Sequence, residues 1–199
     1  MVASRSYELL VPADSDRLLD DPRLEARFAQ DEYLPYWAVL WPAALLLADA
    51  VATWPPATRD PPPLVLELGC GLGLVGLVAA ERGCSVIQSD YDEDALAFAR
   101  ANGRHNGFSS IETRHLDWRQ IYPDLRPHGI LAADVLYETR NLEPIARFIA
   151  AHLEPAGFAL LADADRSTAD SFPHVAQTCG LTVTTTAGAH GRLFSARRA

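Results

Sequence analysis

The chain of 199 residues contains no lysine, and its strongly basic side chains are all arginines. Acidic residues outnumber arginines by 26 to 17, so the formal net charge at pH 7 is −9. Proteins that bind nucleic acids neutralise phosphates with an excess of basic side chains, which this composition lacks. We therefore expect no nucleic-acid partner.

Cysteines, paired histidines and long apolar runs are also scarce. Cys70, Cys84 and Cys179 form no even set and have no metal-ligand spacing, so we expect reduced thiols and a cytoplasmic protein. The six histidines are scattered, and we expect no metal. The longest mainly apolar run, residues 42–51, is too short to cross a bilayer, and no charged-then-apolar signal opens the chain. These features predict no membrane partner.

Glycine is concentrated where it is most informative, in the stretch LVLELGCGLGLVG at residues 64–76. An apolar run stops at Gly69, Gly71 and Gly73, and an apolar, alanine-rich segment follows. The pattern predicts a buried parallel strand, a tight turn and the start of a helix. Glycines let the backbone turn sharply and let a ligand approach main-chain atoms closely. We expect a nucleotide-like cofactor at this turn.

The remainder of the chain alternates between strand and helix patterns. Strands are expected at residues 65–68, 85–88, 111–116, 130–133, 158–162, 181–186 and 191–196. Helices are expected at residues 74–82, 92–102, 142–153 and 169–179. The alternation predicts an α/β fold, a Rossmann-like doubly wound sheet of about seven strands. No helix separates the final pair of strands, so we expect a mostly parallel sheet with an antiparallel last strand.

A short helical segment, residues 1–60, precedes the cofactor-binding domain at residues 61–199. Helical patterns cover residues 22–30 and 42–52, and a proline-rich stretch then leads into the first strand. Trp37 and Trp41 need apolar cover that so short a segment cannot supply alone. We expect this segment to pack on the cofactor site, and the chain to be a monomer.

The glycine turn allows two interpretations of the cofactor. Residues 71–76 match the dinucleotide fingerprint GxGxxG, but in that motif the first glycine directly ends the strand. Here the strand ends at Gly69, which places Glu67 at the start of an ExGxGxG register. A carboxylate inside an apolar strand needs a partner. The ammonium group of S-adenosylmethionine (SAM) would supply one, whereas a pyrophosphate would be repelled; exposure of Glu67 at the strand end is the structural alternative.

The second expected strand ends in an acid, Asp90. A carboxylate there can accept hydrogen bonds from both hydroxyls of a ribose, whichever cofactor binds. Tyr91 beside it is placed to flank an adenine. These residues favour an adenosine-containing ligand without naming it.

Together these residues resemble the class I SAM-dependent methyltransferases, from about residue 63 to the end of the chain. ELGCGLG matches their first motif, and Asp90 matches their ribose ligand. LPYWAVLWP, LDW and ADVLYE, at residues 34–42, 116–118 and 133–138, are similar to the seven-β-strand lysine methyltransferase branch. That branch includes the enzymes modifying calmodulin and the electron-transfer flavoprotein β-subunit, and its [DE]xx[YF] motif reads Asp134-Val-Leu-Tyr137 here. LADADRS resembles an aspartate-and-arginine stretch of the flavoprotein type, with Ala164 where proline is usual.

The resemblance implies roles for the matched residues. Glu67 and the glycines would hold the methionine end of SAM, Asp90 the ribose, and Asp117 with Trp118 the adenine. With Trp41 as a cover and Tyr91 included, the expected cofactor-binding residues are Trp41, Glu67, Gly69, Gly71, Gly73, Asp90, Tyr91, Asp117 and Trp118. The expected catalytic residues are Asp134 and Tyr137. A turn cap for Asp134 and a core position for Tyr137 are the alternatives.

The leading hypothesis is a SAM-dependent N-methyltransferase that acts on a protein lysine. A small amine or heterocyclic nitrogen is the first alternative acceptor, as in enzymes similar to nicotinamide methyltransferase. A NAD-binding oxidoreductase is disfavoured by Glu67 and by the lack of a catalytic Tyr–Lys pair, because the chain has no lysine. A non-catalytic scaffold is disfavoured by the intact glycine loop and DxxY motif.

Overall fold

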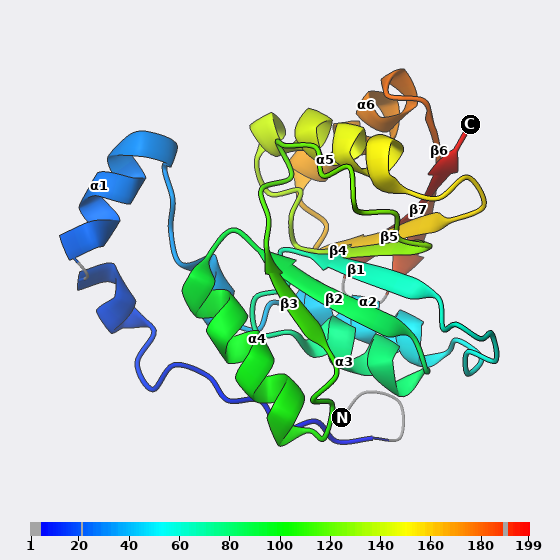
Figure 1. Cartoon of the computed structure of the whole chain (residues 1–199). Coiled ribbons are helices and arrows are strands. Elements are labelled where there is room, and N and C mark those ends of the chain that lie inside the picture. Colours follow the sequence, from blue (N-terminus) through cyan, green and yellow to red (C-terminus); the bar gives the residue numbers. More distant parts are fainter. Residues whose placement is uncertain (1–4, 21, 189–190) are drawn as a thin grey trace.

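The structure is a computed structural model that describes residues 5–20, 22–188 and 191–199. Its centre is a seven-stranded sheet with the strand order β3-β2-β1-β4-β5-β7-β6 (Figure 1). The strands are β1 (Leu64–Leu68), β2 (Ser85–Asp90), β3 (Glu112–His115), β4 (Gly129–Ala133), β5 (Phe158–Asp163), β6 (Leu181–Gly188) and β7 (Gly191–Arg198). Strands β1 to β5 pair in parallel, and β7 is antiparallel to both of its neighbours. The expected α/β sheet with an antiparallel last strand is confirmed.

The helices follow the strand–helix alternation. They are α1 (Pro22–Asp31), α2 (Pro42–Ala52), α3 (Leu74–Glu81), α4 (Glu93–His105), α5 (Thr139–His152) and α6 (Phe172–Thr178). Short 3₁₀ helices cover η1 (Asp16–Asp20), η2 (Tyr36–Ala38) and η3 (Ser167–Ser171). Within the described ranges, no helix combines the length and the apolar character that a bilayer span requires.

Apolar side chains on both faces of the sheet explain its doubly wound form. On one face, Leu66 and Ile130 of the sheet pack in a cluster with residues of α5 and α6, such as Ile145 and Phe172. On the other face, a second cluster joins the sheet to α2 and α3. Figure 1 shows α5 and α6 on one side of the sheet and α2, α3 and α4 on the other. The central strands are therefore buried on both faces, as their apolar runs predict.

The segment before β1 has two differently placed parts. Helix α2 lies against the body, because Ala43, Leu47 and Val51 are buried in the cluster with β1 and α3. Helix α1 stands away from the sheet and is joined to the body by extended chain (Figure 1). Of the two helices expected in this segment, α2 therefore packs on the sheet and α1 does not.

Most element boundaries fall within a few residues of those expected, and one helix differs more. The pattern at residues 169–179 predicts a single helix, but the chain forms η3 first and α6 afterwards. Pro173 occupies the first turn of α6, where its missing N–H costs nothing. An α-helix running on from residue 169 would need an N–H at position 173 to donate to the carbonyl of residue 169, and proline has none, so the α-helix begins at Phe172 instead. The expected cap of α4 is confirmed, since Asp92 accepts a hydrogen bond from the Asp94 N–H.

Candidate functional site

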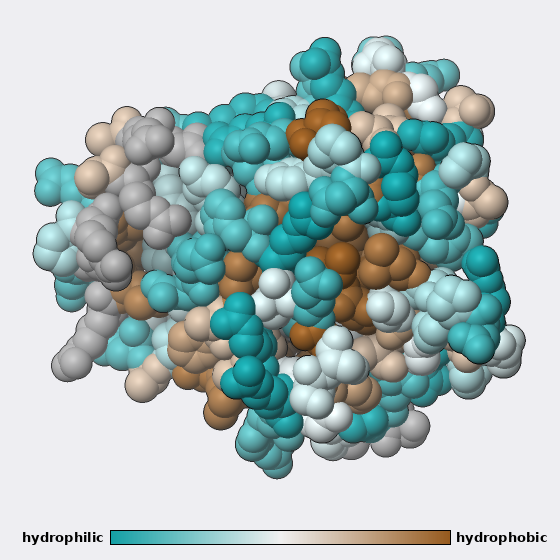
Figure 2. Space-filling model, viewed as in Figure 1, coloured by the Kyte–Doolittle hydropathy of each residue, from teal (hydrophilic) through white to brown (hydrophobic). Residues whose placement is uncertain are grey.

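A cavity of about 350 Å³ lies at the carboxyl ends of β1 to β4, beneath the segment of residues 32–41. This is the edge where ligands bind in open α/β sheets, and the volume falls in the range of small-molecule sites. Figure 2 shows a mostly hydrophilic face on which hydrophobic residues gather near the centre, over the sheet. The expected site residues that line the cavity are Trp41, Glu67, Gly69, Gly71, Asp90, Tyr91, Asp117, Trp118, Asp134 and Tyr137.

Gly73 is the expected site residue that does not line this cavity. It caps the N-terminus of α3 with a φ of 84°, a left-handed conformation that favours glycine. A Cβ at this position would lie 2.6 Å from Nε2 of Gln88. Gly73 therefore shapes the turn and permits close packing with β2, rather than forming part of the cavity wall.

Glu67 is the buried acid of the glycine motif, with a residue exposure of only 3%. Its Oε2 accepts hydrogen bonds from the Gly76 N–H at 2.9 Å and from Nε2 of Gln88 at 3.0 Å. The first of these bonds satisfies an amide in the first turn of α3, which has no partner inside the helix. Burial nevertheless raises the pKa of Glu67 to about 8, because both partners are neutral. The protein thus supplies some of the hydrogen bonds that Glu67 was expected to receive from a ligand. Neither of these two donors carries a positive charge that would compensate the carboxylate.

Asp90, at the end of β2, holds the glycine turn in place. Its Oδ2 accepts from the Gly71 N–H at 2.9 Å, and its Oδ1 accepts from the Asp92 N–H at 3.0 Å. Burial raises the pKa of Asp90 to about 6 despite these bonds. Each carboxylate oxygen has two lone-pair sites, so Asp90 retains capacity for further hydroxyl donors.

The β3 end of the cavity is formed by Asp117, Trp118 and Tyr91. Burial alone would raise the pKa of Asp117, but hydrogen bonds and an ion pair with Arg119 hold it below its usual value. The Arg119 guanidinium also lies over the Tyr91 ring, 5.3 Å from its centroid. This end is therefore a flat, partly aromatic surface with an ionised carboxylate beside it.

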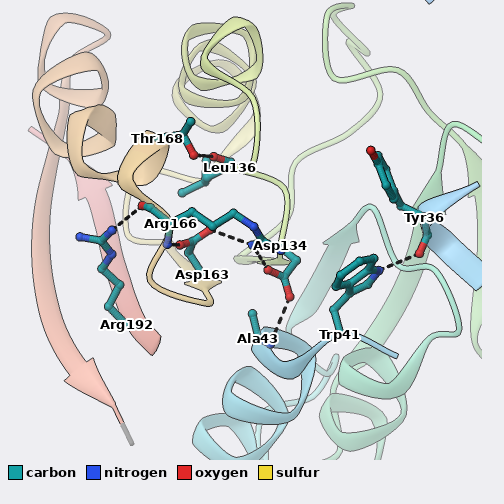
Figure 3. Close-up of polar contacts among 9 residues, drawn as sticks. All are labelled: Tyr36, Trp41, Ala43, Asp134, Leu136, Asp163, Arg166, Thr168 and Arg192. Carbon is teal, nitrogen blue, oxygen red and sulfur yellow. Dashed lines mark hydrogen bonds and ion pairs between the residues drawn. The ribbon is translucent and has the colours of Figure 1, made fainter. Parts of the chain in front are cut away.

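Asp134 follows β4 and has an unusual backbone conformation, with a φ of 56°. Such angles are uncommon outside glycine and often mark functional positions. Its Oδ2 accepts from the Ala43 N–H at 3.1 Å, and its Oδ1 forms an ion pair with Arg166 (Figure 3). Asp134 is thus a cap, but of the first turn of α2 and not of the turn that follows it in sequence.

Arg166 belongs to this site, although no role was expected for it. Its guanidinium pairs with Asp134 and, at 3.2 Å, with the buried Asp163 of β5. Its main-chain oxygen accepts from Arg192 at 2.6 Å, and its guanidinium lies 5.9 Å from the Trp41 ring centroid. Figure 3 shows how this chain of contacts links β7, the loop after β5, the loop after β4 and α2. The LADADRS resemblance was the available signal for it.

Three aromatic rings line the cavity beside Asp134. Tyr36 makes edge-to-face contacts with Trp41, at 6.0 Å between centroids, and with Tyr137, at 5.4 Å. The indole Nε1 of Trp41 donates to the main-chain oxygen of Tyr36 at 2.7 Å (Figure 3). Burial raises the pKa of Tyr137 to about 12, so its phenol stays protonated at neutral pH. Tyr36 was not among the site residues expected from the sequence, because its spacing does not distinguish it from a residue that serves only in packing.

The residues present fit SAM, the cofactor that the resemblance implies. Glu67 is buried and Asp90 is half-buried, and the protein groups that donate hydrogen bonds to them are neutral. Burial raises the pKa of both acids. A bound ammonium group and ribose hydroxyls would supply the charge and the donors that these carboxylates lack. In the described part of the chain, no group of acidic, histidine and cysteine side chains is arranged to hold a metal ion.

Comparisons with known proteins show the family to which the chain belongs. Residues 21–173 match the model of a family described as "Lysine methyltransferase". The chain is 34% identical over 128 residues to histone-arginine methyltransferase METTL23 of Mus musculus, covering 61% of this chain and 50% of that protein. It is 35% identical over 105 residues to protein N-lysine methyltransferase METTL21A of Xenopus tropicalis, covering 50% and 47%. The chain thus spans about half the length of these two relatives.

The fold is also that of solved methyltransferases. The structure of the glycopeptide N-methyltransferase MtfA, complexed with SAM, superposes with a TM-score of 0.64 at 15% identity, over 79% of this chain and 94% of that one. At that identity the likeness concerns the fold alone. The match to the family model, which covers most of the chain, carries the assignment: the chain belongs to the lysine methyltransferase family.

Proposed function

We propose that the chain transfers a methyl group from SAM to the side-chain nitrogen of a protein lysine. The carrying observation is that one cavity joins the acids Glu67 and Asp90 to the Asp134–Tyr137 motif. The family match and the relative named as a protein N-lysine methyltransferase support the same reaction. We propose only the type of residue that is methylated, a lysine, and not the protein that carries it.

The cavity residues divide the work of binding. Glu67 provides the negative charge for an ammonium group, and Asp90 accepts hydrogen bonds from ribose hydroxyls. Asp117 and Trp118 provide the acceptor and the flat surface that suit an adenine. When bound, SAM supplies a methyl group already activated on a sulfonium. The protein therefore has to position the acceptor and exclude water rather than activate the donor.

The acceptor nitrogen must be neutral to react, whereas a lysine in water has a pKa of about 10.4. Both oxygens of Asp134 already accept one donor each, from Arg166 and from the Ala43 N–H. Each still has a free lone-pair site, so Asp134 can orient an N–H-bearing acceptor while its own position stays fixed. Tyr137, protonated at neutral pH, contributes a hydroxyl and a ring face and does not act as a base. Positioning is accordingly the role we assign to the pair.

A protein arginine is the second candidate acceptor. It is favoured by the relative named as a histone-arginine methyltransferase, which is 34% identical over 61% of this chain. A guanidinium is planar and stays charged, with a pKa above about 12, so it would need a different arrangement of acceptors from that of a lysine amine. The product of the reaction separates the two candidates.

The test is methylation of a lysate of the source cell with SAM carrying a tritiated methyl group. After ultrafiltration and acid hydrolysis of the retained protein, chromatography separates methyl-lysine from methylarginine. The chain contains no lysine, so self-methylation of its side chains cannot produce the methyl-lysine signal. We expect label in methyl-lysine, and none with the Asp90→Ala variant. Label in methylarginine favours the second candidate, and label only in the small-molecule filtrate overturns both.

A further inference from the structure

The order of the strands divides the cavity into a cofactor side and an acceptor side. In the order β3-β2-β1-β4, the expected contacts to adenine, ribose and methionine follow one another along β3, β2 and β1. The reacting methyl group would then lie near the boundary of β1 and β4. The part of the cavity beside β4 is left for the acceptor, and its lining comprises Ala133, Asp134, Val135, Tyr137, Glu138, Arg140 and Asn141.

The acceptor side is bounded by an aromatic wall, which we define as Tyr36, Trp41 and Tyr137. All three line the cavity, and Tyr36 contacts both of the others. Tyr36 is 41% exposed, so its ring is accessible to an incoming ligand. Trp41 already has the Arg166 guanidinium 5.9 Å from its ring centroid, within the range of a cation–π contact. One ring of the aromatic wall is therefore already in contact with a cationic side chain.

The charges around the cavity favour a cation. The acidic residues that line it are Glu32, Glu67, Asp90, Asp117, Asp134 and Glu138, and the basic ones are Arg119 and Arg140. Arg140 forms ion pairs with Glu32 and Glu138 at the β4 side. On this side three acids, Glu32, Asp134 and Glu138, face two arginines, Arg140 and Arg166. A positively charged side chain entering here therefore meets a net negative charge, and its alkyl stem meets the aromatic wall.

We propose that Tyr36 is a specificity-determining residue, whose ring, with that of Tyr137, binds the alkyl stem and the cationic head of a lysine acceptor. The proposal rests on the proposed function and deepens it. Methylation of a lysine nitrogen removes N–H donors but keeps the positive charge. A ring face still attracts that charge, whereas a carboxylate that acts through N–H bonds loses its donors. The wall therefore binds lysine and its methylated forms alike.

The experiment uses two small probes of matched length. Nα-acetyl-Nε-trimethyl-lysine amide carries the cation, and the amide of Nα-acetyl-2-amino-7,7-dimethyloctanoic acid, in which a tert-butyl group replaces the trimethylammonium, is its neutral counterpart. Each is titrated into the full chain saturated with S-adenosylhomocysteine, and binding is followed by the NMR signal of the Trp41 indole N–H, assigned with Trp41→Phe. We expect the cation to bind about fivefold more tightly than the neutral probe, the size of an exposed cation–π contact. Tyr36→Leu should lower the ratio, which the remaining carboxylates and the Tyr137 ring keep above one, and Tyr36→Phe, which keeps the ring, should preserve it.

Calorimetric titration of S-adenosylhomocysteine into each variant separates this proposal from the proposed function. We expect the cofactor product to bind wild type, Tyr36→Leu and Tyr36→Phe with the same affinity. If wild type does not bind it, the proposed function fails. If it binds but the probes are not distinguished, or Tyr36→Leu distinguishes them as well as wild type does, the role of Tyr36 is refuted and the methyltransferase proposal stands. Loss of cofactor binding in Tyr36→Leu alone would assign Tyr36 to the cofactor side and also refute it.

Discussion

Glu67 satisfies two requirements that conflict within one side chain. It must be buried to accept from the Gly76 N–H at the start of α3, and in the proposed function it must be ionised to attract the ammonium group of SAM. Burial raises its pKa to about 8, so the ionised form is disfavoured in the free protein near neutral pH. Such a group lowers stability for the sake of binding, a compromise common at functional sites.

Replacing Glu67 by Gln should make the protein more stable and weaken cofactor binding. The amide oxygen can still accept from Gly76 and Gln88, while the cost of burying a charge disappears. We expect the melting temperature to rise by about 2–4 °C for each kcal/mol gained. SAM affinity should fall by about 1.5–3 kcal/mol, the scale of hydrogen bonds to a charged group. Calorimetry measures both quantities.

The exposed Glu112 of β3 provides the matched control, since Glu112→Gln changes the same chemistry in solvent. It should leave melting temperature and affinity unchanged. A Glu67→Gln protein that is less stable than wild type would show that the carboxylate is ionised and well compensated in the free chain.

Asp134 calls for two substitutions, because it has both a structural and a proposed catalytic role. Asp134→Ala removes the acceptor for the Ala43 N–H and the partner of Arg166, so we expect a stability loss of about 1–3 kcal/mol. Asp134→Asn keeps an acceptor for Ala43 and should cost less. Both should keep SAM affinity within about threefold, under about 1 kcal/mol. Both should lower single-turnover methyl transfer about a hundredfold, as loss of a positioning group does.

The pair of variants distinguishes the possible roles. If Asp134→Asn keeps full activity, capping the first turn of α2 is the only role left for Asp134. Loss of SAM binding with normal chemistry at saturation would place Asp134 in the cofactor pocket. Tyr137→Ala should reduce turnover more mildly than either change.

Sequence reasoning located single residues well where a local pattern specifies the backbone. Gly69, Gly71 and Glu67 lie at the cavity because the strand–turn register follows directly from the chain. Tyr36 was not among the expected residues, because its place at the cavity depends on contact with Tyr137, about a hundred positions further on. That contact follows from the fold and has no signature in the spacing of residues.

At the scale of elements, α2 was likewise predicted in part: its bounds followed from the sequence, and its cap did not. Its bounds were predicted because Pro42 suits a first helical turn and an apolar run follows. What holds its N-terminus was not predicted, since the cap comes from Asp134, in the loop after β4. The single expected helix over residues 169–179 failed for a local reason, the proline at the start of α6.

Two leucines of α2 test whether this helix is part of the domain core. Leu47 is fully buried among residues of the cluster with β1 and α3, whereas Leu45 is 42% exposed. We expect Leu47→Ala to lower the free energy of unfolding by about 2–5 kcal/mol, since it leaves a cavity. Leu45→Ala, the control on the same helix, should change it by about 0.5 kcal/mol or less. Equal effects in urea unfolding would mean that α2 is not packed on the sheet in solution.

At the scale of the whole molecule, the parallel sheet gathers chemistry from distant segments. The loops after β1, β2, β3 and β4 meet at one edge, and residues 32–41 cover them. The strand–helix alternation predicted this meeting, because parallel strands place all their carboxyl ends together. It did not predict that α1 stands off the body, since an amphipathic pattern does not say what its apolar side faces.

The gathering of the buried Glu67 and the half-buried Asp90 at one edge predicts how cofactor binding depends on pH. Burial raises the pKa of Glu67 to about 8 and that of Asp90 to about 6 in the free protein. A bound cation favours the ionised carboxylates, so binding below pH 8 must release the proton of Glu67. We expect SAM affinity to rise between pH 6 and pH 8, by up to about tenfold per pH unit. Calorimetric titrations across this window measure the slope.

Over the same range, from pH 6 to pH 8, the contribution of Glu67 to folding stability should fall while SAM affinity rises. This difference excludes unfolding linked to Glu67 as the cause of weak binding at low pH. The folded chain keeps the proton of Glu67 up to about pH 8, whereas the unfolded chain releases it near the ordinary value of 4.5. Between these values the folded state binds more protons, so this group makes stability fall as pH rises. Weaker binding at pH 6 therefore cannot come from unfolding caused by this group. In Glu67→Gln the proton is absent, and the pH dependence of SAM affinity between pH 6 and pH 8 should flatten. An unchanged slope in this variant would assign the titration to another group.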